Sequence, residues 1–241
     1  LHDHDKSCGL LPVERIITKS SNIGAAKIGI KMGSRRLYDY ICDYGFGART
    51  GIPLPFESSG IVHRVEKWSK VSIAQIPMGH GISVTRLQMV MAMSAIANNG
   101  RLMRPFLVNR LEDREGHVMA QYQPELVRQV VSESTAQQMV RALKTVVTKD
   151  GTAEKAAGKT GTAQKTIEGV AGYAAGKYIA SFIGFFPADK PELCISIVMD
   201  EPKQGYYGGL TAAPVFRDFA TAAANYLNIR PDRTNAPAVL A

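Results

Sequence analysis

The chain has 241 residues, of which 45% are hydrophobic and 21% are charged, and its net charge is +8. These values are typical of a globular protein that is long enough to bury a core. The basic residues are scattered and no run of five or more like charges occurs, which excludes nucleic acid as the expected partner. The positive charge also suits an anionic wall polymer or a membrane surface.

Helices are predicted first along the chain. Apolar residues recur at helical spacing behind Pro12, and Ser20-Ser21-Asn22 interrupts the pattern, where we expect either a bend or the meeting of two helices. Gly33 ends this segment, and Ser34 is expected to cap the next helix. Thr85 or Ser83 is expected to cap the helix that follows. The predicted helices cover residues 12–32, 35–44, 86–97, 132–147 and 215–227.

Strands are predicted mainly in the second half. Residues 45–82 are rich in Gly, Pro and Ser and are predicted as an extended loop, and residues 102–131 are expected to hold a short hairpin. Runs of β-branched and aromatic residues predict strands over 159–167, 178–186 and 193–199. Helices followed by strands predict an α+β fold, with an antiparallel sheet flanked by helices.

Neither a metal nor a cofactor is predicted. The three cysteines, Cys8, Cys42 and Cys194, are too widely spaced to indicate a zinc site or a dense disulfide framework. Cys194 lies in an apolar run and is expected to be a buried thiol. The segment His2-Asp3-His4-Asp5 offers possible ligands, but four alternating side chains cannot all face one ion.

The segment Lys159-Thr160-Gly161-Thr162 opens the first of the three later predicted strands. Residues two apart lie on the same side of a strand, so both threonine hydroxyls share one side and Gly161 lets a neighbour pack closely on the other. A cation with two hydroxyls suits a ligand carboxylate. The alternative is an edge strand with a solvated lysine.

Two further segments are candidates for the same site. Ser20 and Asn22 are two residues apart and would not share a face of a regular helix, so a distorted segment or a simple polar kink is expected. Tyr206-Tyr207-Gly208-Gly209 joins the last strand to the last helix. It is either a turn with exposed rings or an aromatic wall over a cleft.

Taken together, these segments resemble the transpeptidase domain of class B penicillin-binding proteins, especially the septal, cell-division branch. S-x-N and K-T-G are two of the three signature motifs of penicillin-recognising serine acyl-enzymes, whereas the third, S-x-x-K, is absent from this sequence. The matching stretches are residues 17–25 (ITKSSNIGA), 76–85 (IPMGHGISVT), 95–100 (AIANNG), 159–164 (KTGTAQ), 178–187 (YIASFIGFFP), 200–203 (DEPK) and 206–216 (YYGGLTAAPVF).

The resemblance implies a role for each matching site residue. Ser20 would relay a proton to or from the leaving amine, and Asn22 would hydrogen-bond the substrate amide. Lys159 would orient Ser20 and supply positive potential. Thr160 and Thr162 would bind the terminal carboxylate of the substrate beside Gly161, and the Thr162 N–H would form half of the oxyanion hole. Tyr207 and Gly208 would lie near the rim of the cleft.

The resemblance also implies the activity and the setting. The parent protein would be a D,D-transpeptidase that cross-links peptidoglycan stem peptides through a seryl acyl-enzyme and binds β-lactam antibiotics. It would be anchored in the cytoplasmic membrane, with this domain on the outer side of the bacterial cell envelope, and would contact other division or elongation proteins. Alternatives are a β-lactamase or carboxypeptidase of the same superfamily, or a non-catalytic β-lactam sensor or division scaffold.

The missing S-x-x-K motif leads to a further expectation. Residues 1–229 would form the C-terminal portion of the transpeptidase domain, without its first strands and its nucleophile helix, and residues 230–241 would form a flexible tail. The chain alone would then be inactive and would carry an open sheet edge.

Overall fold

The computed structural model describes residues 3, 9–147, 156–166, 172–203 and 205–230. By its internal contacts the chain divides into two compact units, residues 1–142 and residues 143–241. Residues 231–241 of the expected tail 230–241 lie outside the described residues, and so does Cys8. Among the residues that are described, no helix combines the length and the apolar character needed to cross a membrane.

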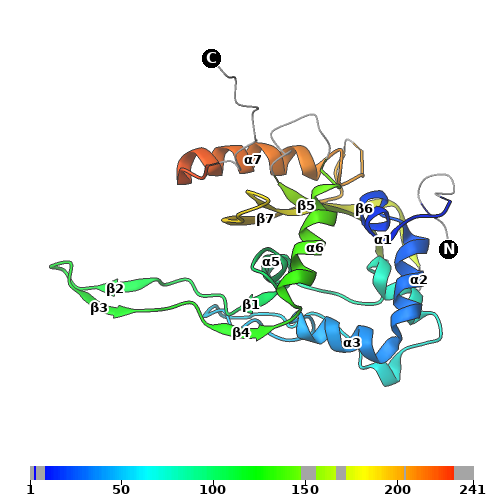
Figure 1. Ribbon diagram of the computed structural model, residues 1–241, viewed down its shortest axis with the longest axis horizontal. Helices are drawn as coiled ribbons and strands as arrows, with labels where there is room; N and C mark the ends of the chain where they lie inside the picture. The colour runs from blue at the N-terminus through cyan, green and yellow to red at the C-terminus, as the bar shows by residue number, and fades with distance from the viewer. Residues whose placement is uncertain (1–2, 4–8, 148–155, 167–171, 204, 231–241) are drawn as a thin grey trace, which may run out of the picture. The chain divides into compact units, whose positions relative to one another are not determined.

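The first unit begins with two helices, α1 (Val13–Lys19) and α2 (Asn22–Met32), so the polar triplet marks the meeting of two helices (Figure 1). The backbone of Ser20 turns into the left-handed region, with φ 51° and ψ 43°, and this ends α1. Ser21 then caps α2 by accepting a hydrogen bond from the Gly24 N–H at 3.0 Å. A side chain at Gly24 would collide with Ile16, so glycine lets the two helices approach closely.

The third helix, α3 (Ser34–Asp43), starts one residue earlier than expected. Ser34 is its first residue and the cap position is occupied by Gly33, without a side-chain hydrogen bond, so the prediction that Ser34 caps this helix is wrong. The backbone of Gly33 has φ 86°, a conformation that glycine adopts without steric cost. A glycine in that conformation separates α2 from α3 without any polar cap.

Residues 45–82 are mostly irregular, as predicted, with three short helical turns at η1 (Val65–Lys67), α4 (Ser72–Gln75) and η2 (Ile76–Met78). Helix α5 (Arg86–Ala97) follows and has a capping box, in which Thr85 accepts from the Gln88 N–H and Gln88 accepts from the Thr85 N–H. The Gln88 amide also donates to the carbonyls of Ala48 at 2.7 Å and Ser59 at 2.9 Å. A single buried glutamine thereby ties the irregular segment to α5.

Residues 101–129 form two separate antiparallel pairs. Strand β1 (Arg101–Met103) pairs with β4 (Leu126–Gln129), and β2 (Arg110–Glu112) pairs with β3 (Val118–Gln121). The β2–β3 hairpin projects beyond the β1–β4 pair (Figure 1). Helix α6 (Glu133–Lys144) follows and ends before Val147, earlier than predicted.

The second unit contains the three predicted strands in an antiparallel sheet, and their order is β5-β6-β7. Its strands are β5 (Ala157–Thr166), β6 (Tyr173–Phe186) and β7 (Leu193–Asp200), and helix α7 (Ala212–Leu227) packs on β6 and β7 (Figure 1). Phe182 and Phe216 join sheet to helix, with ring centroids 4.6 Å apart. Helix α7 starts three residues before the predicted Val215, because Pro214 is tolerated in a first turn.

Candidate functional site

Ser20 and Asn22 lie at the junction of α1 and α2 in the first unit. Ser20 is exposed at the C-terminal end of α1, and Asn22 is the first, half-buried residue of α2. The left-handed turn at Ser20 is the distortion that the two-residue spacing predicted. It turns the chain between two helices, so the two polar side chains are not held to the geometry of one regular helix.

The middle residue of the triplet, Ser21, is buried and has a structural role that the sequence analysis did not foresee. Its hydroxyl donates to the Asp3 carboxylate, whose oxygens lie 3.0 and 2.9 Å away. Asp3 also accepts from the Ile23 N–H at 3.0 Å. Asp3 was considered above as a metal ligand, but this carboxylate instead binds the first turn of α2.

Lys159, Thr160, Gly161 and Thr162 lie on β5 in the second unit. Thr160 and Thr162 stand opposite Phe182 and Ala180 in the pairing with β6, one residue out of phase with Lys159 and Gly161. The two threonines therefore share one side of the strand, as predicted. The place that a Gly161 side chain would fill lies 2.4 Å from the Ser181 hydroxyl, so the expected close packing at Gly161 is confirmed.

Each of the two threonine hydroxyls accepts a hydrogen bond from a nearby donor. The Lys159 ammonium donates to the Thr160 carbonyl at 2.9 Å and to the Thr160 hydroxyl at 3.4 Å. The backbone N–H of Gly208 donates to the Thr162 hydroxyl at 3.1 Å. A hydroxyl has one proton and two acceptor lone pairs, so both hydroxyls keep a proton that they can donate to an incoming acceptor.

Lys159 is half-buried, and desolvation lowers the pKa of its ammonium from the ordinary value of 10.5. Burial disfavours the charged form of a lysine because water solvates the ammonium better than the protein does. A cation held in this way, one residue from a threonine hydroxyl, adds positive potential to β5. The strand thus combines the charge and the donors that an anionic ligand needs.

The loop before α7, which contains Tyr206-Tyr207-Gly208-Gly209, packs against this strand. A side chain at Gly208 would lie 2.3 Å from the Ser181 carbonyl and 2.5 Å from the Gly161 carbonyl. The rings of Tyr206 and Tyr207 are not isolated, because their centroids are 4.4 Å apart and Tyr206 also stacks on Tyr178 at 4.3 Å. Tyr178 in this stack was not singled out from the sequence.

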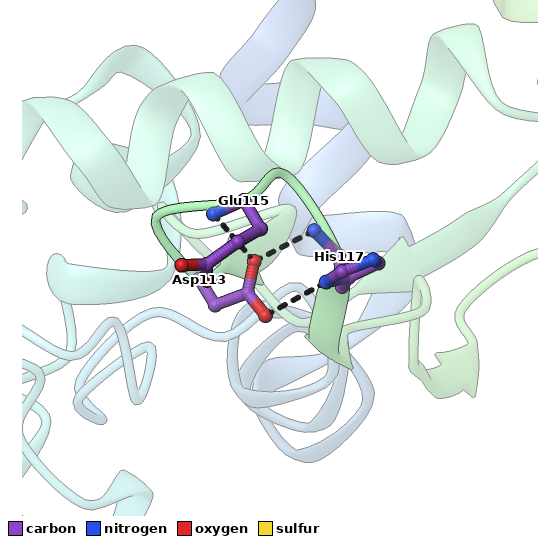
Figure 2. Close-up of side chains that lie close together, drawn as sticks. All are labelled: Asp113, Glu115 and His117. Atoms are coloured by element: carbon purple, nitrogen blue, oxygen red, sulfur yellow. Dashed lines mark hydrogen bonds and ion pairs between the residues drawn. The ribbon is translucent and has the colours of Figure 1, made fainter.

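A second cluster of polar side chains lies at the tip of the β2–β3 hairpin. The ligand atoms of Asp113, Glu115 and His117 are within 4.8 Å of one another, as a metal site would require (Figure 2). One Asp113 oxygen accepts from the N–H groups of Glu115 and His117 at 3.0 and 2.8 Å, and the other contacts the His117 ring at 3.0 Å. Hydrogen bonds that shape the turn thus account for this arrangement.

In the second unit, the predicted site residues lie together around β5. They are Lys159, Thr160, Gly161, Thr162, Tyr207 and Gly208. Ser20 and Asn22 are placed in the first unit. Ser21 and Gln88 were missed, although a glutamine three residues after Thr85 is the signature of a capping box.

Comparison with known proteins identifies the family. Residues 2–221 match the sequence family described as the penicillin binding protein transpeptidase domain. The chain belongs to this family. Its resemblance to class B penicillin-binding proteins is thereby confirmed, and so is the expected fold class.

Individual relatives agree with this assignment. The chain is 36% identical over 232 residues to stage V sporulation protein D of Bacillus subtilis, covering 92% of this chain and 35% of that protein. It is 31% identical over 231 residues to PenA of Neisseria meningitidis, named "Probable peptidoglycan D,D-transpeptidase". This match covers 92% of this chain and 38% of that protein. The chain thus spans about a third of the length of these curated relatives.

Solved penicillin-binding proteins share the fold. Penicillin-binding protein 3 of Mycobacterium tuberculosis, complexed with ampicillin, superposes with a TM-score of 0.86 at 33% identity, covering 98% of this chain and 56% of that one. The transpeptidase domain of Burkholderia pseudomallei penicillin-binding protein 3 gives a TM-score of 0.82 at 30% identity, covering 95% and 69%. This penicillin-binding protein domain therefore has solved relatives over almost its whole length.

Proposed function

We propose that this penicillin-binding protein domain is the carboxylate-binding and proton-relay part of a peptidoglycan D,D-transpeptidase. The reaction would exchange the terminal D-alanine of a stem peptide for the amine of a neighbouring stem. A serine attacks the carbonyl carbon of the penultimate residue, the bond to the leaving D-alanine breaks, and the second amine then displaces the serine. A β-lactam would acylate the same serine.

One observation carries this proposal beyond family membership. Thr160 and Thr162 share one side of β5, and the hydroxyl of each accepts a hydrogen bond from a donor beside it. Each hydroxyl can therefore donate its proton to one oxygen of a carboxylate. Charge-assisted bonds of this kind are about twice as strong as neutral ones, and the nearby Lys159 ammonium strengthens them further. Both a stem peptide and a penicillin carry such a carboxylate.

The remaining roles follow the chemistry of acyl transfer. Ser20 would carry the proton to the leaving amine, and Asn22 would hydrogen-bond the substrate amide. The N–H of Thr162 would stabilise the negative charge on the carbonyl oxygen in the transition state. Lys159 would orient Ser20 and supply positive potential, and its ammonium already donates to the Thr160 hydroxyl that would meet the carboxylate.

The nucleophile would be supplied by polypeptide outside these 241 residues, because no serine in the sequence has a lysine three positions later. The chain alone would then bind ligands weakly and form no acyl-enzyme. The full protein would act in cell-wall synthesis at the bacterial envelope, a proposal that the relatives' names support, and its partners would be other proteins of division or elongation.

Fluorescent penicillin tests this proposal. We expect the full-length protein to form a covalent adduct and the 241-residue chain to form none. Thr162→Val in the full-length protein should slow labelling roughly 10-fold or more, because the variant keeps the shape of threonine but loses a bond to a charged group. Labelling of the 241-residue chain would contradict the assigned roles, and labelling of neither protein would favour a scaffold.

A further inference from the structure

We propose that the backbone N–H of Gly208 is a positioning group, which sets the direction of the Thr162 hydroxyl for carboxylate recognition. This inference rests on the proposed function and adds a residue from the loop before α7 to the carboxylate site. The observation behind it is the 3.1 Å hydrogen bond from the Gly208 nitrogen to the Thr162 hydroxyl oxygen.

The bond determines where the Thr162 proton can point. A hydroxyl that accepts on one side directs its proton away from that donor, toward the remaining directions around the oxygen. Thr162 is exposed, and among the described residues none accepts its hydroxyl proton. Accepting a hydrogen bond also polarises the O–H group and makes it a better donor. The Thr162 hydroxyl is thus prepared to donate before a ligand arrives.

Gly208 itself is held on both sides. Its carbonyl accepts from the N–H groups of Ala212 at 3.0 Å and Ala213 at 2.9 Å, at the start of α7. Ala212 is fully buried, and α7 packs on the sheet through Phe216. The contacts of α7 with the core therefore fix the position of the Gly208 N–H.

Only glycine fits this place. A β-carbon at residue 208 would lie 2.3 Å from the Ser181 carbonyl and 2.5 Å from the Gly161 carbonyl, distances that real side chains do not adopt. Gly208→Ala must push the segment away from β5 and lengthen the bond to Thr162. At Gly209, in contrast, a β-carbon would meet only the Thr160 methyl group at 3.6 Å, an ordinary contact. The neighbouring glycine thus provides a matched control.

The experiment compares acylation of the full-length protein by benzylpenicillin and by its methyl ester, which lacks the carboxylate. We expect Gly208→Ala to slow acylation by the acid roughly 10-fold, the scale of one hydrogen bond to a charged group, with little effect on the methyl ester. Gly209→Ala should keep the wild-type preference for the acid. An equal loss with both compounds would mean that Gly208 only supports the fold, and would overturn the proposal.

A second variant avoids the question of folding. Replacing Gly208 by glycolic acid exchanges the N–H for an ester oxygen and adds no atom that could collide. We expect the same selective loss with the acid, and no further loss when Thr162→Val is already present, because Gly208 acts through that hydroxyl. If this variant kept the wild-type preference for the acid, the role proposed for Gly208 would be wrong, while the proposed function would stand. Wild-type protein that neither compound acylates would overturn the proposed function, and this inference with it.

Discussion

The buried hydroxyl of Ser21 donates to the Asp3 carboxylate, 2.9 Å from its nearer oxygen. The two residues are 18 positions apart, and their contact closes the N-terminal end of α2 directly beside Ser20 and Asn22. A negative charge is favourable there because the backbone N–H groups make the start of a helix positive. The central serine of the S-x-N segment therefore maintains the turn that Ser20 and Asn22 flank.

Asp3→Asn should lower the free energy of unfolding at neutral pH and have less effect in acid. The N–H of Ile23 is the main cause that lowers the pKa of the Asp3 carboxyl below 3.8, opposed by desolvation and helped by the Ser21 hydroxyl. A lowered native pKa gives stability that is present above the unfolded-state value and is lost as the pH falls through the native value. Urea denaturation at pH 7 and near pH 2.5 measures the difference.

Ser21→Ala provides a second test of the same contact. The variant loses both the bond to Asp3 and the cap on the Gly24 N–H, and should cost about 1 kcal/mol. Ser21→Thr keeps the hydroxyl and should cost less. If Asp3→Asn remained equally destabilising at both pH values, the carboxylate charge would not be the cause.

Gln88→Ala should destabilise the first unit strongly. The Gln88 side chain is 1% exposed, and its loss leaves the Thr85 N–H and the carbonyls of Ala48 and Ser59 without this partner. Each of these three hydrogen bonds contributes about 1 kcal/mol, so we expect a loss of about 3 kcal/mol in chemical denaturation.

Gln88→Glu separates hydrogen bonding from shape. It has nearly the same volume and can still accept from the Thr85 N–H, but its second oxygen would face carbonyl oxygens. We expect it to be at least as damaging as alanine at neutral pH. A loss below about 1 kcal/mol for either variant would show that water replaces the amide in this region.

Helices and strands could be predicted from the sequence where neighbouring residues carry the signal. The three strands of the sheet and α7 were predicted because β-branched and aromatic runs and helical periodicity are local signals. The predicted cap of α3 was wrong because Gly33 and Ser34 both suit a helix start, and only the backbone conformation decides between them. Helix α6 was predicted to end three residues too late, since helix ends are set by contacts more than by periodicity.

In the site, too, the spacing of neighbouring residues could be predicted from the sequence, whereas contacts between residues far apart in the sequence could not. The spacing of Thr160, Gly161 and Thr162 was sufficient to predict which side chains share a side of the strand. The bonds from Gly208 to Thr162 and from Ser21 to Asp3 join residues 46 and 18 positions apart, and no local pattern contains them. Contacts of this kind depend on how the elements pack.

The turn at the tip of the β2–β3 hairpin gives a prediction about Asp113. The backbone N–H of His117 is the main cause that lowers the pKa of the Asp113 carboxyl below 3.8. Carbon-detected NMR should therefore find its titration midpoint below that value. The hydrogen bonds of the turn are present above the unfolded-state pKa and weaken as the pH falls through the native one.

His117→Ala is the informative control for this turn. It removes the ring but keeps the backbone N–H, so the pKa of the Asp113 carboxyl should stay lowered. A midpoint that returned to 3.8 would assign the effect to the ring instead. If micromolar Zn²⁺ shifted the signals of residues 113–117 to saturation, the cluster would be a metal site rather than a hydrogen-bonded turn.

Lys159→Met should make the protein more stable and less active. Burial lowers the pKa of the Lys159 ammonium, which means that the native state disfavours the charge. Methionine has a similar length and no charge to desolvate, so we expect the free energy of unfolding to rise by about 1 kcal/mol at neutral pH. Penicillin labelling of the full-length variant should fall steeply, because the cation beside the threonine hydroxyls is gone.

The pH dependence of this gain tests its cause. With a lowered native pKa, the unfolded chain binds the proton more tightly, and the native state regains stability as the pH rises toward 10.5. The advantage of Lys159→Met should therefore shrink between pH 7 and pH 10, as measured by thermal or urea unfolding. An advantage that did not change with pH would point to packing instead. A loss of stability would mean that the hydrogen bonds from the ammonium to Thr160 outweigh the cost of burying its charge.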